Sequence, residues 1–216
     1  MTPQEIISEV DAHGFADTDI NEKERALNAA IRAITVRRDW PFLEKVWTLA
    51  FDGTNPYSTT DISDLRAVKR ILDTTTGARV RFMRTDDMED AHGSELLVKG
   101  TPQLYYFEGT QLRIWQVPSS TQTLRLRGTR RHPLVSASSS LESDILIPSM
   151  AHEAIVLRTL IRLYMLEDDV EMAAAFKPLF DELMVELEQA LQELQMDEAE
   201  YVHVIDDDNW DYDYIY

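Results

Sequence analysis

The sequence predicts an α+β protein. It should contain a helical bundle, built from an N-terminal α-hairpin and two long C-terminal helices, with an inserted antiparallel β module and an extended C-terminal tail. Residues 101–133 are rich in aromatic and β-branched side chains that alternate along the chain, with Gly, Pro and Ser between the runs. This pattern is typical of short strands joined by turns. Helical periodicity lies on both sides of that region, and the last residues have no core-forming pattern.

The three strands of this region are expected to follow one another as a meander. They cover residues 103–107, 111–117 and 123–127. In the third strand, Leu124 and Leu126 alternate with Arg125 and Arg127. Because successive side chains of a strand point to opposite faces, one face of the sheet should be buried and the other exposed to water.

The composition excludes several classes of protein. The chain has 216 residues, 44% of them hydrophobic, which is enough for a substantial core. It has no cysteine, so disulfides, thiolate metal sites and a cysteine nucleophile are excluded. The first residues lack the pattern of a signal peptide, and no apolar run approaches the ~18 residues that span a bilayer. We therefore expect a cytosolic protein without a membrane segment.

Charge is distributed very unevenly along the chain. The formal net charge of −18 argues against a protein that grips nucleic acid. Residues 109–141 nevertheless contain no acid, whereas residues 197–216 contain eight acids and no Lys or Arg. A basic sheet and an acidic tail could bind each other, within one chain or between neighbouring copies. The arginines that we interpret as inter-subunit residues are Arg113, Arg125, Arg127, Arg130 and Arg131.

The N-terminal residues predict an α-hairpin. Thr2 is a plausible N-cap with Pro3 at the first helical position. A second amphipathic helix should begin near Thr18 or Asp19 and end before Trp40, because the following proline disfavours a helical conformation there.

The middle of the chain predicts further strands and one ambiguous segment. Strands are expected over residues 46–51, 67–72 and 79–83. Residues 85–92 are acidic and polar, and their pattern fits a short helix or an exposed loop. A serine-rich stretch then indicates a linker back to the helices. The predicted domains are a helical bundle from residues 1–44 and 147–196, a β-rich module over 45–135, a linker over 136–146 and an extended docking tail over 197–216.

Two helices are predicted after the linker. The first runs from Pro148 to about Leu166 and is apolar on nearly all sides, which indicates a buried central helix. Asp168 and Asp169 should cap the second, whose predicted seam is Phe176, Phe180, Leu183, Leu187, Ala190 and Leu194. Pro178 lies inside this helix, so we expect a kink near Ala174 or a restart of the helix.

The acidic, aromatic C-terminus fits either a docking tail or plain disorder. Large apolar side chains are costly to leave in water and are common interface anchors, which favours docking. The predicted partner-binding residues are Tyr201, Val204, Ile205, Trp210, Tyr212, Tyr214, Ile215 and Tyr216.

The sequence offers little for catalysis. His152 and Glu153 resemble the start of a zinc-protease helix, but Val156 occupies the position of the second ligand. The acidic stretch 86–92 could hold a divalent cation, although its spacing does not match a calcium loop. No phosphate-binding loop or nucleophile elbow is present. We therefore assign no catalytic, cofactor-binding or metal-binding residue, and do not expect an enzyme.

Aromatic residues near the arginines admit a nucleic-acid interpretation. Tyr105, Tyr106 and Trp115 could stack on bases. The net charge favours the alternative, in which these aromatics belong to the core and the arginines pair with acids of the same or a neighbouring chain.

The order of features resembles a known family. The matching residues are Arg37-Arg38-Asp39-Trp40-Pro41-Phe42-Leu43, Gly100-Thr101-Pro102, Tyr105-Tyr106-Phe107, Leu112-Arg113-Ile114-Trp115-Gln116-Val117-Pro118 and Ile147-Pro148. Over about residues 15–195 the chain is similar to the head-to-tail connector (adaptor, or head-completion) proteins of tailed bacteriophages.

The resemblance implies a structural protein of the virion neck, made in the host cytoplasm. It implies a homo-oligomeric ring, usually a dodecamer, that lies beneath the portal, joins the capsid to the tail and surrounds the DNA channel. Its partners would be the portal protein, neighbouring copies and the next neck or tail protein, with DNA passing through without specific binding. The terminal segment 201–216 would reach into the partner ring.

Two alternatives remain open from the sequence. One is another neck or tail-completion protein closer to the tail tube. The other is a non-viral cytosolic adaptor that self-associates through its last helix.

Overall fold

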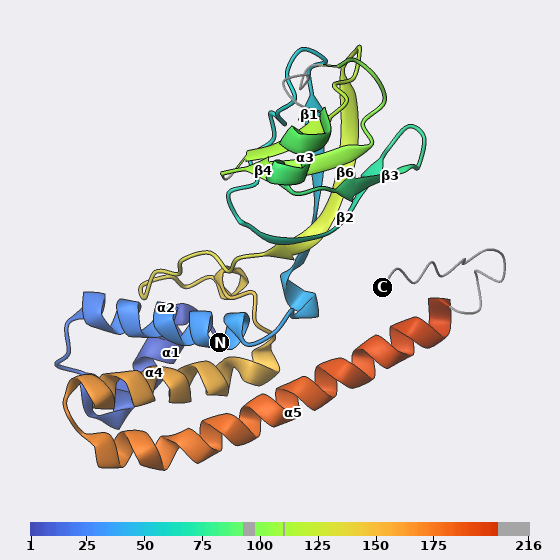
Figure 1. Ribbon diagram of the computed structural model, residues 1–216. Coiled ribbons are helices and arrows are strands. Elements are labelled where there is room, and N and C mark those ends of the chain that lie inside the picture. Colours follow the sequence, from blue (N-terminus) through green and yellow to red (C-terminus); the bar gives the residue numbers. More distant parts are fainter. Residues whose placement is uncertain (93–97, 110, 203–216) are drawn as a thin grey trace. The chain divides into compact units, whose positions relative to one another are not determined.

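The computed structural model describes residues 1–92, 98–109 and 111–202 (Figure 1). The chain divides into two compact units. A helical unit combines Met1–Arg37 with the chain from Leu134 onward, and a β unit comprises Arg38–Pro133. The described residues therefore form a mixed α+β protein, as the sequence predicts.

The helical unit contains α1 (Pro3–Val10), α2 (Ile20–Val36), α4 (His152–Leu166) and α5 (Val170–Val202). Short helical turns η1 (Asp11–Phe15), η3 (Glu142–Asp144) and η4 (Ser149–Ala151) lie between them. Local chemistry sets the helix starts: Thr2 and Glu5 form a capping box at α1, and the Asp19 carboxylate accepts a hydrogen bond from the Asn21 amide at 2.7 Å. Both caps agree with the prediction.

Helix α4 is the centre of the helical unit, because α1, α2 and α5 all pack against it. Its buried residues lie around most of its circumference, which confirms the predicted buried helix. Side chains of the core of this unit include Ile6, Leu27, Ile31, Ile34, Ile155, Leu160 and Met184.

Helix α5 differs from the prediction in three respects. It runs through Pro178 as one helix without a restart, and it continues to Val202 although the extended tail was predicted from residue 197. Its buried seam is Ala173, Phe180, Met184, Leu187 and Leu191, on both sides of the exposed Pro178, whereas Phe176, Leu183 and Ala190 of the predicted seam are only half-buried. Packing of this seam compensates for one missing backbone donor. Residues 197–202 include Glu and Ala, which are good helix formers.

The serine-rich segment is held against α1 and α2 by polar contacts. The Asn28 side chain bonds both backbone groups of Val135, at 2.9 and 2.8 Å. The Glu24 carboxylate accepts from the Ala137 amide at 3.0 Å, and the Gln4 amide donates to the Ser139 carbonyl at 3.0 Å. Val135 and Ala137 are buried, so this segment is part of the packed helical unit.

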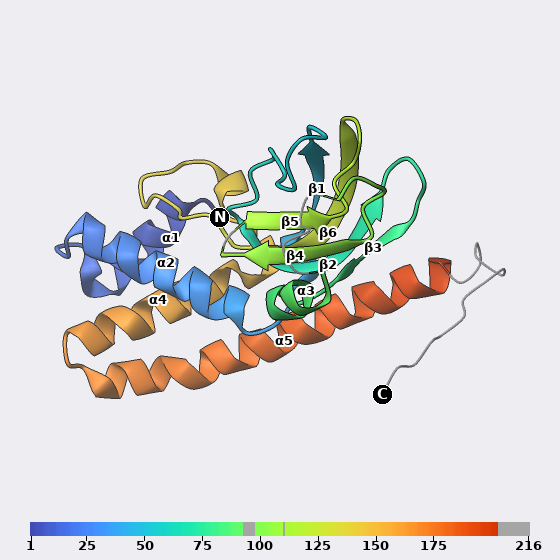
Figure 2. The same ribbon diagram turned by 45° about the horizontal axis from the view of Figure 1, so that its top comes forward.

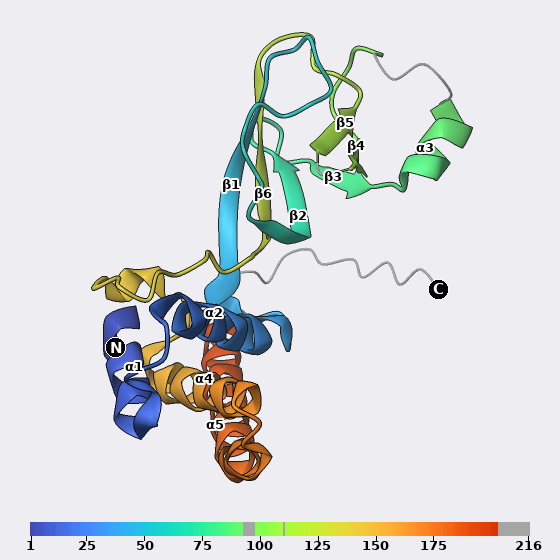
Figure 3. The ribbon, with the colours of Figure 1, turned by 90° about the vertical axis from the view of Figure 1, so that its left-hand side faces the viewer.

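The β unit contains a short 3₁₀ turn, η2 (Pro41–Leu43), six strands and one helix. The strands are β1 (Glu44–Phe51), β2 (Leu65–Asp73), β3 (Arg79–Phe82), β4 (Leu104–Glu108), β5 (Gln111–Trp115) and β6 (Gln122–Arg130). They form one sheet in the order β1-β6-β2-β3-β4-β5, which curls around its core (Figure 3). Helix α3 (Thr85–His92) resolves the ambiguous acidic stretch as a helix.

Two aspects of the predicted β module are wrong. The last three strands do not form a meander, because β6 inserts between β1 and β2 and pairs antiparallel with both. The sheet is also not purely antiparallel, since β3 and β4 pair in parallel through a crossover that contains α3. Parallel neighbours require such a crossover, whereas turn residues read from the sequence specify only where strands end. Strands β4 and β5 do form the expected hairpin (Figure 2).

The loop between β1 and β2 covers both edges of the sheet. The Thr59 amide donates to the Ala50 carbonyl of β1 at 2.9 Å, and the Thr60 hydroxyl donates to the Thr48 carbonyl at 2.9 Å. On the opposite edge, the Ile114 amide of β5 donates to the Pro56 carbonyl at 3.0 Å. Covered edges cannot pair readily with a strand of another chain.

The inner face of the curled sheet is the core of the β unit. Its buried cluster consists of Trp47, Leu49, Phe51, Ile71, Val80, Tyr105, Leu112, Ile114, Leu124 and Leu126. Burial of Tyr105 here, and of Tyr106 on the other face of β4, supports the core interpretation of these aromatics over base stacking.

Gly128 is required where β6 passes between its two neighbours. A Cβ atom at this position would lie 2.4 Å from the Ala67 carbonyl oxygen of β2. We expect Gly128→Ala to lower the free energy of unfolding of the β unit by about 1–3 kcal/mol, because backbone must move to admit the methyl group. Urea denaturation followed by tryptophan fluorescence measures this, since Trp40, Trp47 and Trp115 all lie in the β unit.

Arg125→Ala is the matched control for this substitution, because it lies on the same strand with an exposed side chain. Its effect should stay within about 0.5 kcal/mol. Equal stability of Gly128→Ala and the parent chain would contradict the packing of β6 described above.

Candidate interaction surfaces

Five arginines share the outer face of the sheet. The alternation of β6 is as predicted: Leu124 and Leu126 are buried, and Arg125 and Arg127 are exposed. The strand register places arginines of β2 and β3 on the same face. Arg70 of β2 lies opposite Arg127 of β6, and Leu72 of β2 lies between Arg125 of β6 and Arg79 of β3. We call the exposed side chains of Arg70, Arg79, Arg81, Arg125 and Arg127 the arginine face.

The arginine face is only partly neutralised. Glu44 on β1 accepts from Arg127 at 2.9 Å (Nε) and 2.7 Å (Nη2), and also pairs with Lys69. Burial alone would raise the pKa of Glu44, but hydrogen bonds from Lys69 and Arg127 outweigh it and hold that pKa below its ordinary value. Within the described parts of the chain, the other four arginines of this face form no ion pair.

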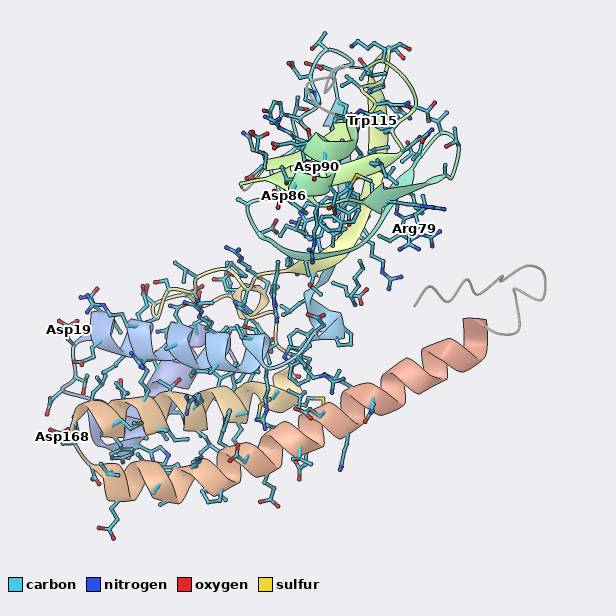
Figure 4. All side chains as sticks on the ribbon, viewed as in Figure 1. Asp19, Arg79, Asp86, Asp90, Trp115 and Asp168 are labelled. Carbon is cyan, nitrogen blue, oxygen red and sulfur yellow. The ribbon has the colours of Figure 1, made fainter. Side chains whose placement is uncertain are left out.

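Arg79 shows the orientation of this face. Its side chain points away from the sheet in Figure 4. Its neighbours along β3 are Val80, which is buried in the core, and Arg81, which is exposed. Like charges on adjacent strands repel one another, so the arginine face favours an anionic partner.

Arg113 lies in a different environment from the other arginines. Its guanidinium group pairs with Glu108 and lies 4.0 Å from the centre of the Tyr57 ring, and its side chain is only 15% exposed. Burial lowers the pKa of this guanidinium group. Arg113 is thus engaged within its own chain.

The five arginines selected from the sequence do not form one site. Arg125 and Arg127 belong to the arginine face, Arg130 is half-buried and Arg131 is exposed at the end of β6. Sequence reasoning missed Arg70, Arg79 and Arg81, because they enter the face only through the pairing of β6 with β2 and of β2 with β3. The alternation Arg79-Val80-Arg81 indicates that both arginines lie on one face of their strand, but it does not reveal which strand is the neighbour.

Helix α5 is acidic on the side away from its buried seam. Between Lys177 and Val202 the sequence of α5 has eight acids and no Lys or Arg. Asp181 and Glu188 lie 3.8 and 3.6 Å from the guanidinium group of Arg37 at the end of α2. Glu182 and Glu186 are exposed and have no such partner among the described residues.

The predicted docking residues lie mostly outside the described residues. Tyr201 belongs to the last turn of α5. The others, Val204, Ile205, Trp210, Tyr212, Tyr214, Ile215 and Tyr216, fall in the part of the chain that the structure does not describe.

His152 has a structural role in the helical unit. It is buried, with Nδ1 2.8 Å from the Met1 amino group and Nε2 2.9 Å from the Ile147 carbonyl. An ammonium group can only donate, so Nδ1 accepts and Nε2–H donates to Ile147. Burial lowers the pKa of this imidazole, which favours the neutral form that the contacts need.

The acidic stretch of α3 does not gather into a metal site. Asp86 and Asp90 point outward from the helix in Figure 4. Across the described residues, no three His, Asp or Glu side chains come together in a group that could hold a metal ion.

No described helix is both long and apolar enough to cross a membrane. The candidate sites among the described residues are charged surfaces, which select and orient partners by electrostatic complementarity.

Comparison with protein families identifies the particular family. The profile described as SU10 adaptor protein matches residues 1–203, so the chain belongs to the SU10 adaptor protein family. A search of curated proteins finds no match. Membership confirms the resemblance to phage head-to-tail adaptors. The protein is accordingly a bacteriophage structural adaptor, which is not a class of enzymes, and a virion component that interacts with other head or tail proteins.

Glu44 should contribute measurably to the stability of the β unit. We expect Glu44→Gln to lower the free energy of unfolding by about 1 kcal/mol at neutral pH, because it leaves Lys69 and Arg127 without their carboxylate. Its pKa is lower in the folded state, so the contribution is fully present above pH 4.5 and is lost as the pH falls through the folded-state value. Urea denaturation at pH 7 and at about pH 3.5 measures both effects.

Glu89→Gln on exposed α3 is the control for a change of net charge alone. The difference between parent and Glu44→Gln should shrink at the lower pH. An unchanged difference at the two pH values would contradict the ionic role of Glu44.

Proposed function

We propose that this protein is a head-to-tail adaptor that forms a ring of identical copies beneath the portal. The ring, a dodecamer by analogy with related connectors, joins the capsid to the tail and surrounds the DNA channel. The observation that carries the proposal is the family match over residues 1–203, which covers every described element of both units.

Several features of the structure support assembly through side chains. A ring requires heterologous contacts, in which one surface of a copy meets a different surface of the next. The chain has surfaces of opposite charge, the arginine face on the β unit and the acidic side of α5 on the helical unit. The β1–β2 loop covers both sheet edges, which disfavours the addition of strands.

The overall charge is compatible with a DNA conduit. A net charge of −18 repels phosphate groups, so DNA can pass an acidic surface without being held. Specific binding of DNA is not part of the proposed function.

A cytosolic adaptor that self-associates through its last helix is the rival class. Two residues of the seam that such an adaptor would use, Phe180 and Leu187, are buried within the helical unit with at most 8% of their surface exposed, and Phe176, Leu183 and Ala190 are half-buried. Helix α5 packs against α4 there. Phe180 and Leu187 are therefore not available to a second copy without unfolding.

The proposed docking element is the acidic, aromatic C-terminus. Ordering this segment on a partner costs conformational entropy, which burial of its aromatic side chains would offset. Its partner is proposed to be the portal ring.

The first experiment is a mass determination of the chain alone and after mixing with the portal ring of the same phage. We expect a monomer or small species alone and a multi-copy ring on the portal, because the portal supplies the template for the heterologous contacts. Native mass spectrometry or mass photometry gives the copy number. A fixed dimer or tetramer that ignores the portal would reject the proposal.

A second experiment tests the C-terminus. Deletion of residues 203–216 should abolish assembly on the portal while the urea transition of the β unit stays unchanged, because the deletion removes no residue of α5 or of the β unit. Portal binding is measured by co-sedimentation.

Two variants separate the contributions of aromatic and acidic groups. Trp210→Ala with Tyr212→Ala and Tyr214→Ala should lose binding, whereas Asp206→Asn with Asp207→Asn and Asp208→Asn should retain most of it. Parent-like binding by the deletion variant would contradict the docking role.

A further inference from the structure

We propose that the arginine face of one copy binds the acidic side of α5 in a second copy. This inference rests on the proposed ring and specifies which two surfaces meet within it. Within the described parts of its own unit, the arginine face is neutralised only at Arg127, by Glu44, and the exposed Glu182 and Glu186 of α5 form no ion pair. The two surfaces therefore have opposite charge.

The acidic side of α5 is a single row by helical geometry. At about 100° per residue, positions 182 and 186 lie about 40° apart and so share one side of the helix. Both are acidic and exposed, and we call Glu182 and Glu186 the acidic row. They are about 6 Å apart along the helix axis.

The acidic row lies on the side opposite the packed seam. By the same geometry, Ala173, Phe180, Met184, Leu187 and Leu191 are centred about 150° away from the row. Both members of the row agree with this placement, because Glu182 and Glu186 are exposed. Figure 1 shows that α5 continues well past the end of α4.

Each surface by itself contains like charges that repel one another. Acids four residues apart on a helix repel one another, as do Glu182 and Glu186. Arg70 and Arg127 are directly opposite on adjacent strands, which is also repulsive. Contact between the two surfaces would remove both repulsions, and guanidinium groups form strong paired hydrogen bonds with carboxylates.

The dimensions of the two surfaces are compatible. The row Arg125, Leu72 and Arg79 crosses three strands that are about 4.8 Å apart, so the two guanidinium stems start about 10 Å from each other. Glu182 and Glu186, four residues apart on α5, are separated by about 6 Å along the helix axis. Because Glu and Arg side chains are long and flexible, a helix laid across the strands can present these two carboxylates to both arginines.

A second copy is favoured over nucleic acid as the occupant. Any DNA that approached the arginine face would meet a chain of net charge −18, whereas α5 carries a large share of that negative charge itself. Since each copy has one of each surface, the contact is heterologous and can close into a ring.

The test uses two chains that each carry one cysteine, which is specific because the natural chain has none. Thr48→Cys places a thiol on the arginine face, opposite Arg125 in the register, and Gln189→Cys places one beside the acidic row. Both positions are exposed. Under mild oxidation at low salt, a mixture of the two chains should yield a disulfide-linked heterodimer of twice the chain mass.

Charge reversal then tests the proposed chemistry. Arg79→Glu with Arg81→Glu and Arg125→Glu in the Thr48→Cys chain should reduce the heterodimer about tenfold or more. Glu182→Lys with Glu186→Lys in the Gln189→Cys chain should do the same. Combining the two reversed chains should restore the heterodimer, because the complementary charges have exchanged sides. A failure to restore it would overturn the proposal.

Two other results would also overturn it. The first is no heterodimer in the mixture while a chain with both cysteines closes on itself, which would assign the contact to a single copy. The second is salt-dependent binding of duplex DNA that is lost in the triple arginine variant, together with no heterodimer, which would assign the arginine face to nucleic acid.

The result of this cross-linking test does not depend on the result of the portal experiment. Portal rings that assemble equally well from all charge variants would keep the adaptor function and reject this contact. A heterodimer with the expected charge dependence but no binding to the portal would keep the contact and reject the adaptor function.

Discussion

Strand β6 is the element on which the β unit depends, because it is hydrogen-bonded along its length to β1 on one side and β2 on the other. Its leucines fix the inner face of the sheet, and its arginines fix the outer face. A shift by one residue would exchange the two sets, so the apolar core determines the register. The close approach of Gly128 to the β2 backbone reinforces this position. Core formation and the arginine face are therefore consequences of the same pairing.

The helical unit depends in the same way on the burial of α4. Three helices pack on it, and the segment after β6 is tied to α2 by Asn28 and Glu24. Helix α5 uses one side for this packing and leaves the other side acidic and exposed.

Charge in this protein is segregated, and the segregation has a physical consequence. Arginines gather on one sheet face, and acids without compensating Lys or Arg occupy the chain after Lys177. Glu44 neutralises one part of the arginine face and leaves the rest available to an anion. The SU10 adaptor family, to which the chain belongs, works through contacts with other phage proteins. Complementary surfaces of this kind provide orientation and partner selection more than raw affinity.

The sequence by itself determined the local features: the helix caps at Thr2 and Asp19, the buried helix α4 and the alternation of β6. Each of these follows from residues that are close together in the chain. It also determined the family, through the order of short motifs along the chain. Only the tertiary structure decided that β6 inserts between β1 and β2, that β3 and β4 are parallel, and that Arg70 and Arg79 join Arg125 on one face. Strand pairing depends on which distant segments complete a common core. That depends on packing in three dimensions, which turn residues and alternation do not encode.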